Sequence, residues 1–124
     1  MEEFNEWLAW ARLDLEAARL TRQKQDLAPI VVFHCHECFE KALKALCLRH
    51  GLEIQKTHDI RLLHKHLLPH APWLNEFDDG VLEMHNLFGD SRYPSGDQIT
   101  IEEAGQCLVI AELFFERFLE RGFD

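Results

Sequence analysis

One stretch of the sequence decides the fold: Phe33-His34-Cys35-His36-Glu37-Cys38-Phe39-Glu40-Lys41-Ala42-Leu43-Lys44-Ala45-Leu46. At about 100° per residue, most of its apolar side chains fall in one broad sector of a helix, which we expect to face a core. With Leu43 at its margin, this sector contains Val31, Val32, Cys35, Cys38, Phe39, Ala42, Ala45 and Leu46. The pattern predicts a helix over approximately residues 28–50, capped by Asp26, with Pro29 in its first turn and Gly51 at its end.

The opposite side of this helix mixes charged and apolar residues, namely Phe33, Glu37, Glu40, Lys41, Lys44 and Leu48. Glu37 precedes Lys41, and Glu40 precedes Lys44, at the favourable i, i+4 spacing with the acid first. One interpretation is a solvated pair that stabilises the helix by about 0.3–0.5 kcal/mol. The alternatives are that Lys44 binds a phosphate, or that this side docks against a second subunit. Phe33 on the same side favours contact over solvation.

The rest of the chain also shows helical spacing of apolar residues. It predicts a helix over residues 3–24, a short helix that starts at Ile60 and is stopped by Pro69, a helix that starts at Trp73 with Gly89 just past its end, and a last helix over 101–121. We therefore predict an all-α fold: an antiparallel up-and-down bundle of four longer helices plus one short helix, forming a single domain over residues 1–124.

Capping signals support the starts of two of these helices. Thr100 and Glu103 have the spacing of a capping box, and Thr57 or Asp59 can cap the short helix. No strand or hairpin pattern occurs in the sequence.

Composition and charge narrow the possible partners. Thirteen Lys and Arg against 22 Asp and Glu give a net charge of −9, which disfavours binding to duplex DNA. No apolar run approaches the roughly 20 residues of a membrane span, so we expect no membrane contact. An acidic start at Met1-Glu2-Glu3-Phe4 and four cysteines within apolar helical patterns predict a cytoplasmic protein with free thiols.

Four segments together resemble the HEPN domain family. They are Asp14-Leu15 with Ala17 and Ala18, the stretch from His36 to Ala45, His58-Asp59-Ile60 with Leu63, and Ser91-Arg92-Tyr93-Pro94. Within the second segment, Glu40-Lys41 and Lys44-Ala45 match the family's Glu-Lys-x-x-Lys-Ala pattern, while His36-Glu37 stands where members often carry Gln-Gln. The resemblance implies a small helical bundle of the kind found beside minimal nucleotidyltransferases and in toxin–antitoxin pairs.

The ribonuclease signature of this family, an Arg followed four to six residues later by His, is absent after Arg92. Cleavage of RNA through its 2′-OH needs a group that moves protons near neutral pH and a cation for the phosphate. Arg92 supplies only the cation, and Tyr93 is a poor base. We therefore expect no intrinsic activity unless His58 or His85 reaches the site from elsewhere in the fold.

The predicted ligand site consists of Arg92, Tyr93, Lys44 and His58, with Arg92 binding phosphate through its planar guanidinium. The predicted supporting or interface residues are Asp14, Phe33, His36, Glu37, Glu40 and Lys41. The competing interpretation is structural: Arg92 pairs with a helix carboxylate, Tyr93-Pro94 packs a loop, and Asp14 is a carboxylate at the rim.

We predict neither a metal nor another cofactor. His34 and Cys38 are one helical turn apart, but no second pair of His or Cys completes a zinc site. The expected partners are a second copy of the chain, a nucleotidyltransferase-domain protein, and a nucleotide or RNA. Three functions remain open: a nucleotide- or RNA-phosphate-binding protein, a metal-independent ribonuclease toxin, and a pure protein-interaction module.

Overall fold

The computed structural model describes residues 2–91 and 98–122. Within these residues the chain forms five α-helices, α1 (Glu2–Thr21), α2 (Ala28–Arg49), α3 (Ile60–Leu67), α4 (Asp78–Ser91) and α5 (Ile101–Arg121). Two short 3-10 helices, η1 (Gln25–Leu27) and η2 (Pro72–Phe77), precede α2 and α4. No strand occurs in the described ranges, so the prediction of an all-α fold is confirmed.

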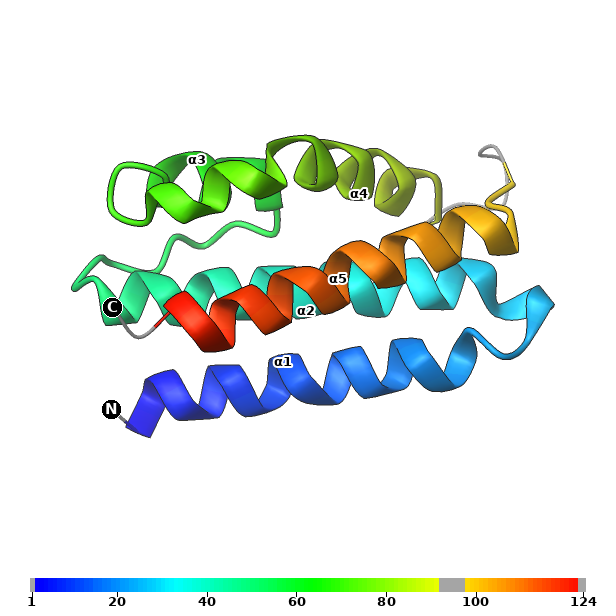
Figure 1. Ribbon diagram of the computed structural model, residues 1–124, viewed down its shortest axis with the longest axis horizontal. Helices are drawn as coiled ribbons and strands as arrows, with labels where there is room; N and C mark the ends of the chain where they lie inside the picture. The colour runs from blue at the N-terminus through cyan, green and yellow to red at the C-terminus, as the bar shows by residue number, and fades with distance from the viewer. Residues whose placement is uncertain (1, 92–97, 123–124) are drawn as a thin grey trace.

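The helices form an antiparallel bundle around α2, as Figure 1 shows. Helix α1 lies along one flank of α2, α3 and α4 lie along the other, and α5 runs beside α2 on a third side. The first turn of α1 and the last turn of α5 lie at the same end of the bundle. Because α2 has neighbours on three sides, it is the central helix.

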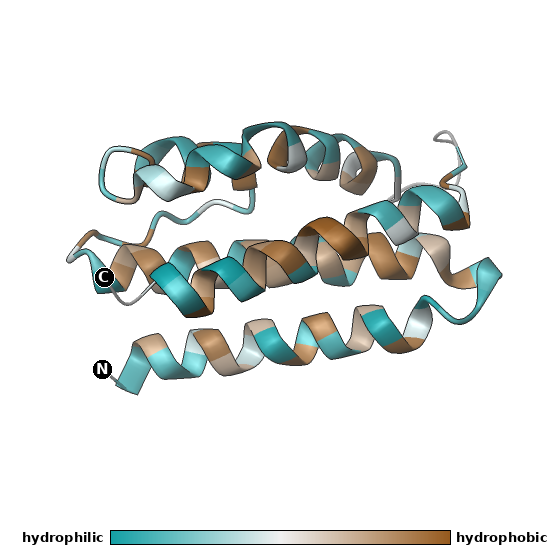
Figure 2. Cartoon of the chain, viewed as in Figure 1, coloured by the Kyte–Doolittle hydropathy of each residue, from teal (hydrophilic) through white to brown (hydrophobic). Residues whose placement is uncertain are grey.

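The apolar sector of α2 builds the core against α5. The Phe39 ring stacks on Phe114 with centroids 4.0 Å apart and planes 11° apart, and Phe77 meets Phe114 edge-on at 5.4 Å. All eight residues assigned to the sector, and Leu43 at its margin, are fully buried. In Figure 2, hydrophobic residues recur at intervals along each helix with hydrophilic residues between them, as expected when one stripe of the helix faces the core.

Several helix ends follow the predicted chemistry. Thr100 and Glu103 form a complete capping box, with both backbone-to-side-chain bonds at 3.0 Å. The Asp59 side chain caps α3 by accepting from the Arg61 backbone N–H at 2.9 Å. Gly51 takes the left-handed conformation at φ 68° just after α2, a backbone state that favours glycine.

Other predicted ends were wrong. Leu27 is the N-cap residue of α2, because Asp26 belongs to the 3-10 turn before it and gives no side-chain cap. Gly89 lies inside α4, which continues to Ser91, and its φ is not positive. The region from Trp73 to Phe77 is a 3-10 helix. These differences move helix boundaries and leave the bundle unchanged.

The largest correction concerns the side of α2 that the sequence left to solvent or a partner. Glu40 is 4% exposed and Lys44 is 6% exposed, so they are not a solvated surface pair. A helical wheel separates the two sides of one helix, but it does not show how many neighbours that helix has. Here α1 and the α3–α4 layer cover much of the second side.

The cysteines fit the prediction of free thiols. Cys35, Cys38, Cys47 and Cys107 are buried and unbridged. Burial raises the pKa of the Cys107 thiol to about 12, so this sulfur stays protonated and unreactive near neutral pH. Among the described helices, none is both long and apolar enough to cross a membrane.

Candidate functional site on the polar side of α2

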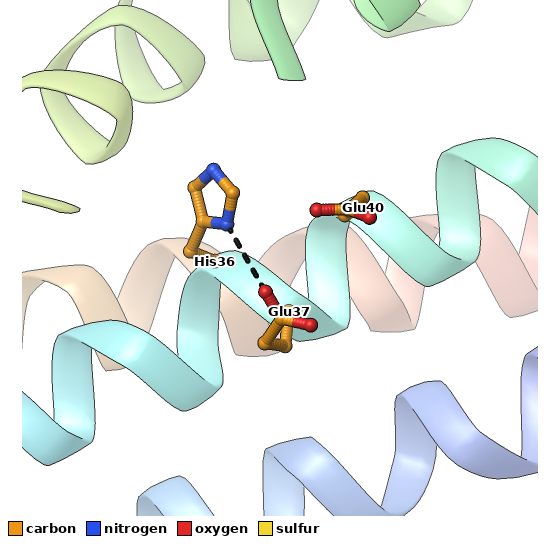
Figure 3. Close-up of side chains that lie close together, drawn as sticks. All are labelled: His36, Glu37 and Glu40. Carbon is orange, nitrogen blue, oxygen red and sulfur yellow. Dashed lines mark ion pairs between the residues drawn. The ribbon is translucent and has the colours of Figure 1, made fainter. Parts of the chain in front are cut away.

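The polar side of α2 carries His34, His36, Glu37, Glu40, Lys41 and Lys44. Figure 3 views this side with α5 behind α2, α1 below it and α4 above it. His36 projects toward α4, and Glu40 lies one turn further along the helix. The polar side therefore occupies the seam between α1 and the α3–α4 layer.

Glu40 is the centre of this seam. Its Oε2 accepts a hydrogen bond from Lys44 Nζ at 3.0 Å and contacts His58 Nδ1 at 2.8 Å. The Lys44 ammonium also lies 5.7 Å from the centre of the Trp7 ring of α1, a cation–π distance. Two predicted ligand residues, Lys44 and His58, are thus brought together through one buried carboxylate.

The exposure of these partners differs sharply. The Lys44 side chain is 8% exposed, whereas the His58 side chain is 85% exposed. A carboxylate that holds Nδ1 of a neutral imidazole orients the ring and leaves Nε2 as an acceptor. His58 therefore presents an oriented imidazole to solvent, and Lys44 balances the charge of the glutamate that orients it.

Asp14 belongs to a separate group between α1 and α2. It accepts from Lys41 Nζ and contacts His34 Nδ1 at 2.9 Å. Burial is the largest single effect on the pKa of Lys41 and lowers it, but the bond and charge of Asp14, together with the charges of Glu37 and Glu40, raise this pKa overall. Asp14 therefore pairs with Lys41 and His34, and it joins two helices in the way a structural carboxylate does.

His36 lies against α4. Its ring is fully buried and stacks on Phe88 with centroids 3.7 Å apart and planes 9° apart. Its Nδ1 lies 3.6 Å from Glu37 Oε1, too far for a good hydrogen bond. The His36 ring lowers the pKa of Glu37, with a smaller contribution from Lys41, against the opposing effect of burial. Phe33, which is 42% exposed, also stacks on Phe88, with ring centroids 6.3 Å apart.

His85 lies near Asp59, the residue that follows His58. Its Nδ1 is 3.5 Å from Asp59 Oδ1, and Asp59 also accepts from the Arg61 guanidinium at 2.9 Å. The Arg61 side chain is the main cause that lowers the pKa of Asp59. Burial lowers the pKa of His85, which favours its neutral form. Both histidines named as alternative proton carriers therefore contact carboxylates on the same side of the bundle.

Arg92 and Tyr93 lie outside the described residues, so their part in the site stays a prediction. Of the other predicted residues, His58, Lys44 and Glu40 form one group, Asp14 and Lys41 a second, and His36, Glu37 and Phe33 a third. Sequence reasoning missed Trp7 and Phe88, the aromatic residues that cover Lys44 and His36. An aromatic residue at helical spacing indicates a core position and gives no sign of a polar contact.

The helical bundle and the polar central helix define a known class of domain. The family model of the HEPN domain matches residues 4–121, and the chain belongs to this family. No curated protein matches the chain significantly.

Two solved structures share the fold. TT1696 from Thermus thermophilus superimposes with a TM-score of 0.84 at 23% sequence identity, over 98% of this chain and 99% of that one. ST0689, described as an archaeal HEPN homologue, gives 0.76 at 24% identity, over the same shares. At these identities the two structures establish the fold alone.

Proposed function

We propose that this HEPN protein binds the phosphate of a nucleotide or of RNA beside the polar side of α2, and that it acts with a minimal nucleotidyltransferase in a toxin–antitoxin pair. The observation that carries the binding proposal is the exposed His58 imidazole, held by the buried Glu40. An imidazole in this position donates to a phosphate when protonated. Arg92 supplies the permanent positive charge, and the family resemblance supplies the partner.

The burial of Lys44 defines its part in this proposal. Its charge is matched by Glu40 at 3.0 Å and it is nearly inaccessible to a ligand. We therefore assign phosphate contact to His58 and Arg92, and we assign Lys44 to positioning the Glu40 carboxylate. With a net charge of −9, the protein offers only a local group of donors, which suits one nucleotide or a single RNA strand.

Binding is tested by titrating ATP and a short single-stranded RNA into the wild type, Arg92→Ala and His58→Gln. We expect both variants to weaken binding at least tenfold. Arg19→Ala is the matched control, because Arg19 pairs with Glu112 of α5, away from the polar side. Equal affinity in all four proteins, or no binding by the wild type, would defeat the proposal.

A second candidate function, a metal-independent ribonuclease, is favoured by the same Glu40–His58 contact. A carboxylate that orients a histidine is the arrangement by which enzymes prepare a general base. In such a reaction His58 Nε2 takes the proton of the 2′-OH, the 2′-oxygen attacks the adjacent phosphorus, and the bond to the 5′-oxygen breaks as this oxygen takes a proton from water. Arg92 stabilises the charge on the phosphate.

This candidate is tested by incubating RNA with the protein in the presence of a chelator. We expect a cyclic 2′,3′-phosphate product that disappears in His58→Ala and falls in Glu40→Gln. His85→Ala is the second arm, because His85 is the other candidate proton carrier and contacts Asp59, and cleavage lost there would assign the base to His85; Arg19→Ala is the control. If the wild type leaves RNA intact, the binding function or the interaction-module alternative remains.

Self-association is proposed from the exposed apolar residues on α1 and α2. On α1 they are Trp10, Leu13 and Leu20, and on α2 they are Ile30 and Phe33. Trp10 lies one turn before Asp14 and so flanks the polar side. We propose that this face meets a second copy of the chain. Analytical ultracentrifugation at micromolar concentration tests this, and a pure monomer would remove the dimer.

A further inference from the structure

Three side chains of α2 form a cluster of metal-ligand type. One ligand atom from each of His36, Glu37 and Glu40 can be chosen so that all lie within 4.8 Å of one another. Figure 3 shows the cluster on two successive turns, with the dashed line joining His36 and Glu37. The i, i+1, i+4 spacing brings them together, because residues four apart lie on the same helix face.

The buried atoms of this cluster lack hydrogen-bond partners. Within the described part of the chain, neither ring nitrogen of His36 has one, and the Oε1 of Glu40 also lacks one. Leaving a buried polar atom unpaired destabilises the fold, because the atom has lost its hydrogen bond to water and gained none in return. His36 is fully buried and stacked on Phe88, so its ring nitrogens cannot form hydrogen bonds with solvent water. A metal cation, which accepts electron pairs, would bind a ring nitrogen of His36 and Oε1 of Glu40 at the same time.

We propose that His36, Glu37 and Glu40 bind a divalent transition-metal ion of the zinc class. One imidazole nitrogen and two carboxylate oxygens suit zinc, manganese, iron or cobalt, whereas magnesium and calcium prefer oxygen ligands alone. Metal–ligand bonds of roughly 2.0–2.2 Å place tetrahedral ligands about 3.3–3.6 Å apart. The distance of 3.6 Å between His36 Nδ1 and Glu37 Oε1 already fits, and the ligand atoms of all three residues lie within 4.8 Å of one another.

The surrounding charges allow this assignment. Lys44 and His58 both contact Oε2 of Glu40, which leaves Oε1 for the ion. Lys41 lies 3.7 Å from Glu37 but makes its shorter contact with Asp14. Lys41 therefore only partly neutralises the Glu37 carboxylate, which can still bind a cation. His58 then becomes an outer partner of a ligating carboxylate, an arrangement that strengthens metal sites. Three protein ligands leave a coordination position for water or substrate.

The test uses Co²⁺ as a spectroscopic probe of the untagged protein, since a His tag would itself bind metal. We expect the wild type to give the visible absorption of a four- or five-coordinate Co²⁺ ion, and Zn²⁺ to displace it. Loss of an outer partner alone weakens metal sites about 10–100-fold. His36→Gln and Glu37→Gln remove direct ligands, so each should weaken binding at least a hundredfold.

The matched control is His70→Gln, because the His50 and His70 rings lie 6.0 Å apart and form a rival pair. Wild-type affinity in His70→Gln supports the α2 site. Should His36→Gln fail to fold by circular dichroism, Glu37→Gln decides, because its side chain is 21% exposed and tolerates the change. Absence of Co²⁺ and Zn²⁺ binding by the wild type, unchanged binding in Glu37→Gln, or loss in His70→Gln would overturn the proposal.

Discussion

Both sides of α2 contain buried residues, but contacts of different kinds cover them. The side facing α5 is closed by aromatic and aliphatic packing, with Phe39 stacked on Phe114. The side between α1 and α4 buries Glu40 and Lys44, and its closest contacts are polar and directional. Apolar packing needs no specific partner atoms, whereas paired charges leave single atoms such as Glu40 Oε1 without a partner. Polar groups can therefore be held in place between α1 and α4, but each unpaired buried atom there lowers the stability of the fold.

The largest loss of stability is expected from a substitution on the side of α2 that packs against α5. Phe39→Ala removes a fully buried ring that contacts Phe114 and Phe77, and we expect it to lower the free energy of unfolding by about 3–5 kcal/mol. Urea denaturation followed by circular dichroism measures this. Phe33→Ala is the comparison, because its ring is 42% exposed and should cost much less. A loss below about 1 kcal/mol for Phe39→Ala would contradict the assigned core.

Lys44→Met disrupts the polar side, because it leaves the buried Glu40 carboxylate with His58 as its remaining hydrogen-bonding partner. Removal of one member of a buried pair costs about 3–5 kcal/mol, and we expect a value near the lower end because His58 remains. The double variant Glu40→Gln with Lys44→Met should recover part of this loss in urea denaturation. If the double variant is the less stable of the two, the pair is not coupled as the geometry indicates.

A smaller effect is expected where α3 begins. Asp59→Ala removes the cap of α3, and we expect a loss of about 1 kcal/mol near neutral pH. The fold lowers the pKa of Asp59, mainly through Arg61, so the stabilisation is present above the unfolded value of about 3.9. It disappears as the pH falls through the lower folded value. Thermal unfolding should therefore separate wild type and variant at pH 7 and bring them together in strong acid.

The smallest effect on stability is expected at the exposed rim of the polar side. Trp10 is 61% exposed, so Trp10→Gln should change the free energy of unfolding by less than about 0.5 kcal/mol. The same change should weaken self-association if α1 contributes to a dimer. Sedimentation equilibrium of both proteins measures the two association constants. An unchanged constant would move the dimer contact away from α1.

Much of the fold could be predicted from the sequence because helical periodicity and capping chemistry are local. The core sector of α2, the Asp59 cap and the Thr100–Glu103 box all depend on residues within one or two turns. Gly89 misled the prediction because a glycine near a helix end does not by itself show that the chain turns there. Its place inside α4 depends on packing of the whole helix.

The candidate site was less predictable because its contacts join distant segments. His58 meets Glu40 across 18 positions, and His36 meets Phe88 across two helices. Paired His and Cys are the usual sign of a metal site in a sequence, and the combination of His36 with two glutamates gives no such sign. The structure adds the burial of His36: its two ring nitrogens lie under α4 without a hydrogen-bond partner, which the sequence does not show. The roles of Arg92 and Tyr93 remain predictions.

Gly51 determines how the site is assembled. Its left-handed backbone reverses the chain after α2, and the connection then returns along that helix until it reaches α3 (Figure 1). The length of this returning connection therefore sets whether His58 reaches Glu40. We expect a deletion of a few residues between Gly51 and His58 to leave too little chain for this return and so to withdraw the imidazole from Glu40. The contact between His58 and Glu40 therefore depends on the length of a loop as well as on the packing of the helices.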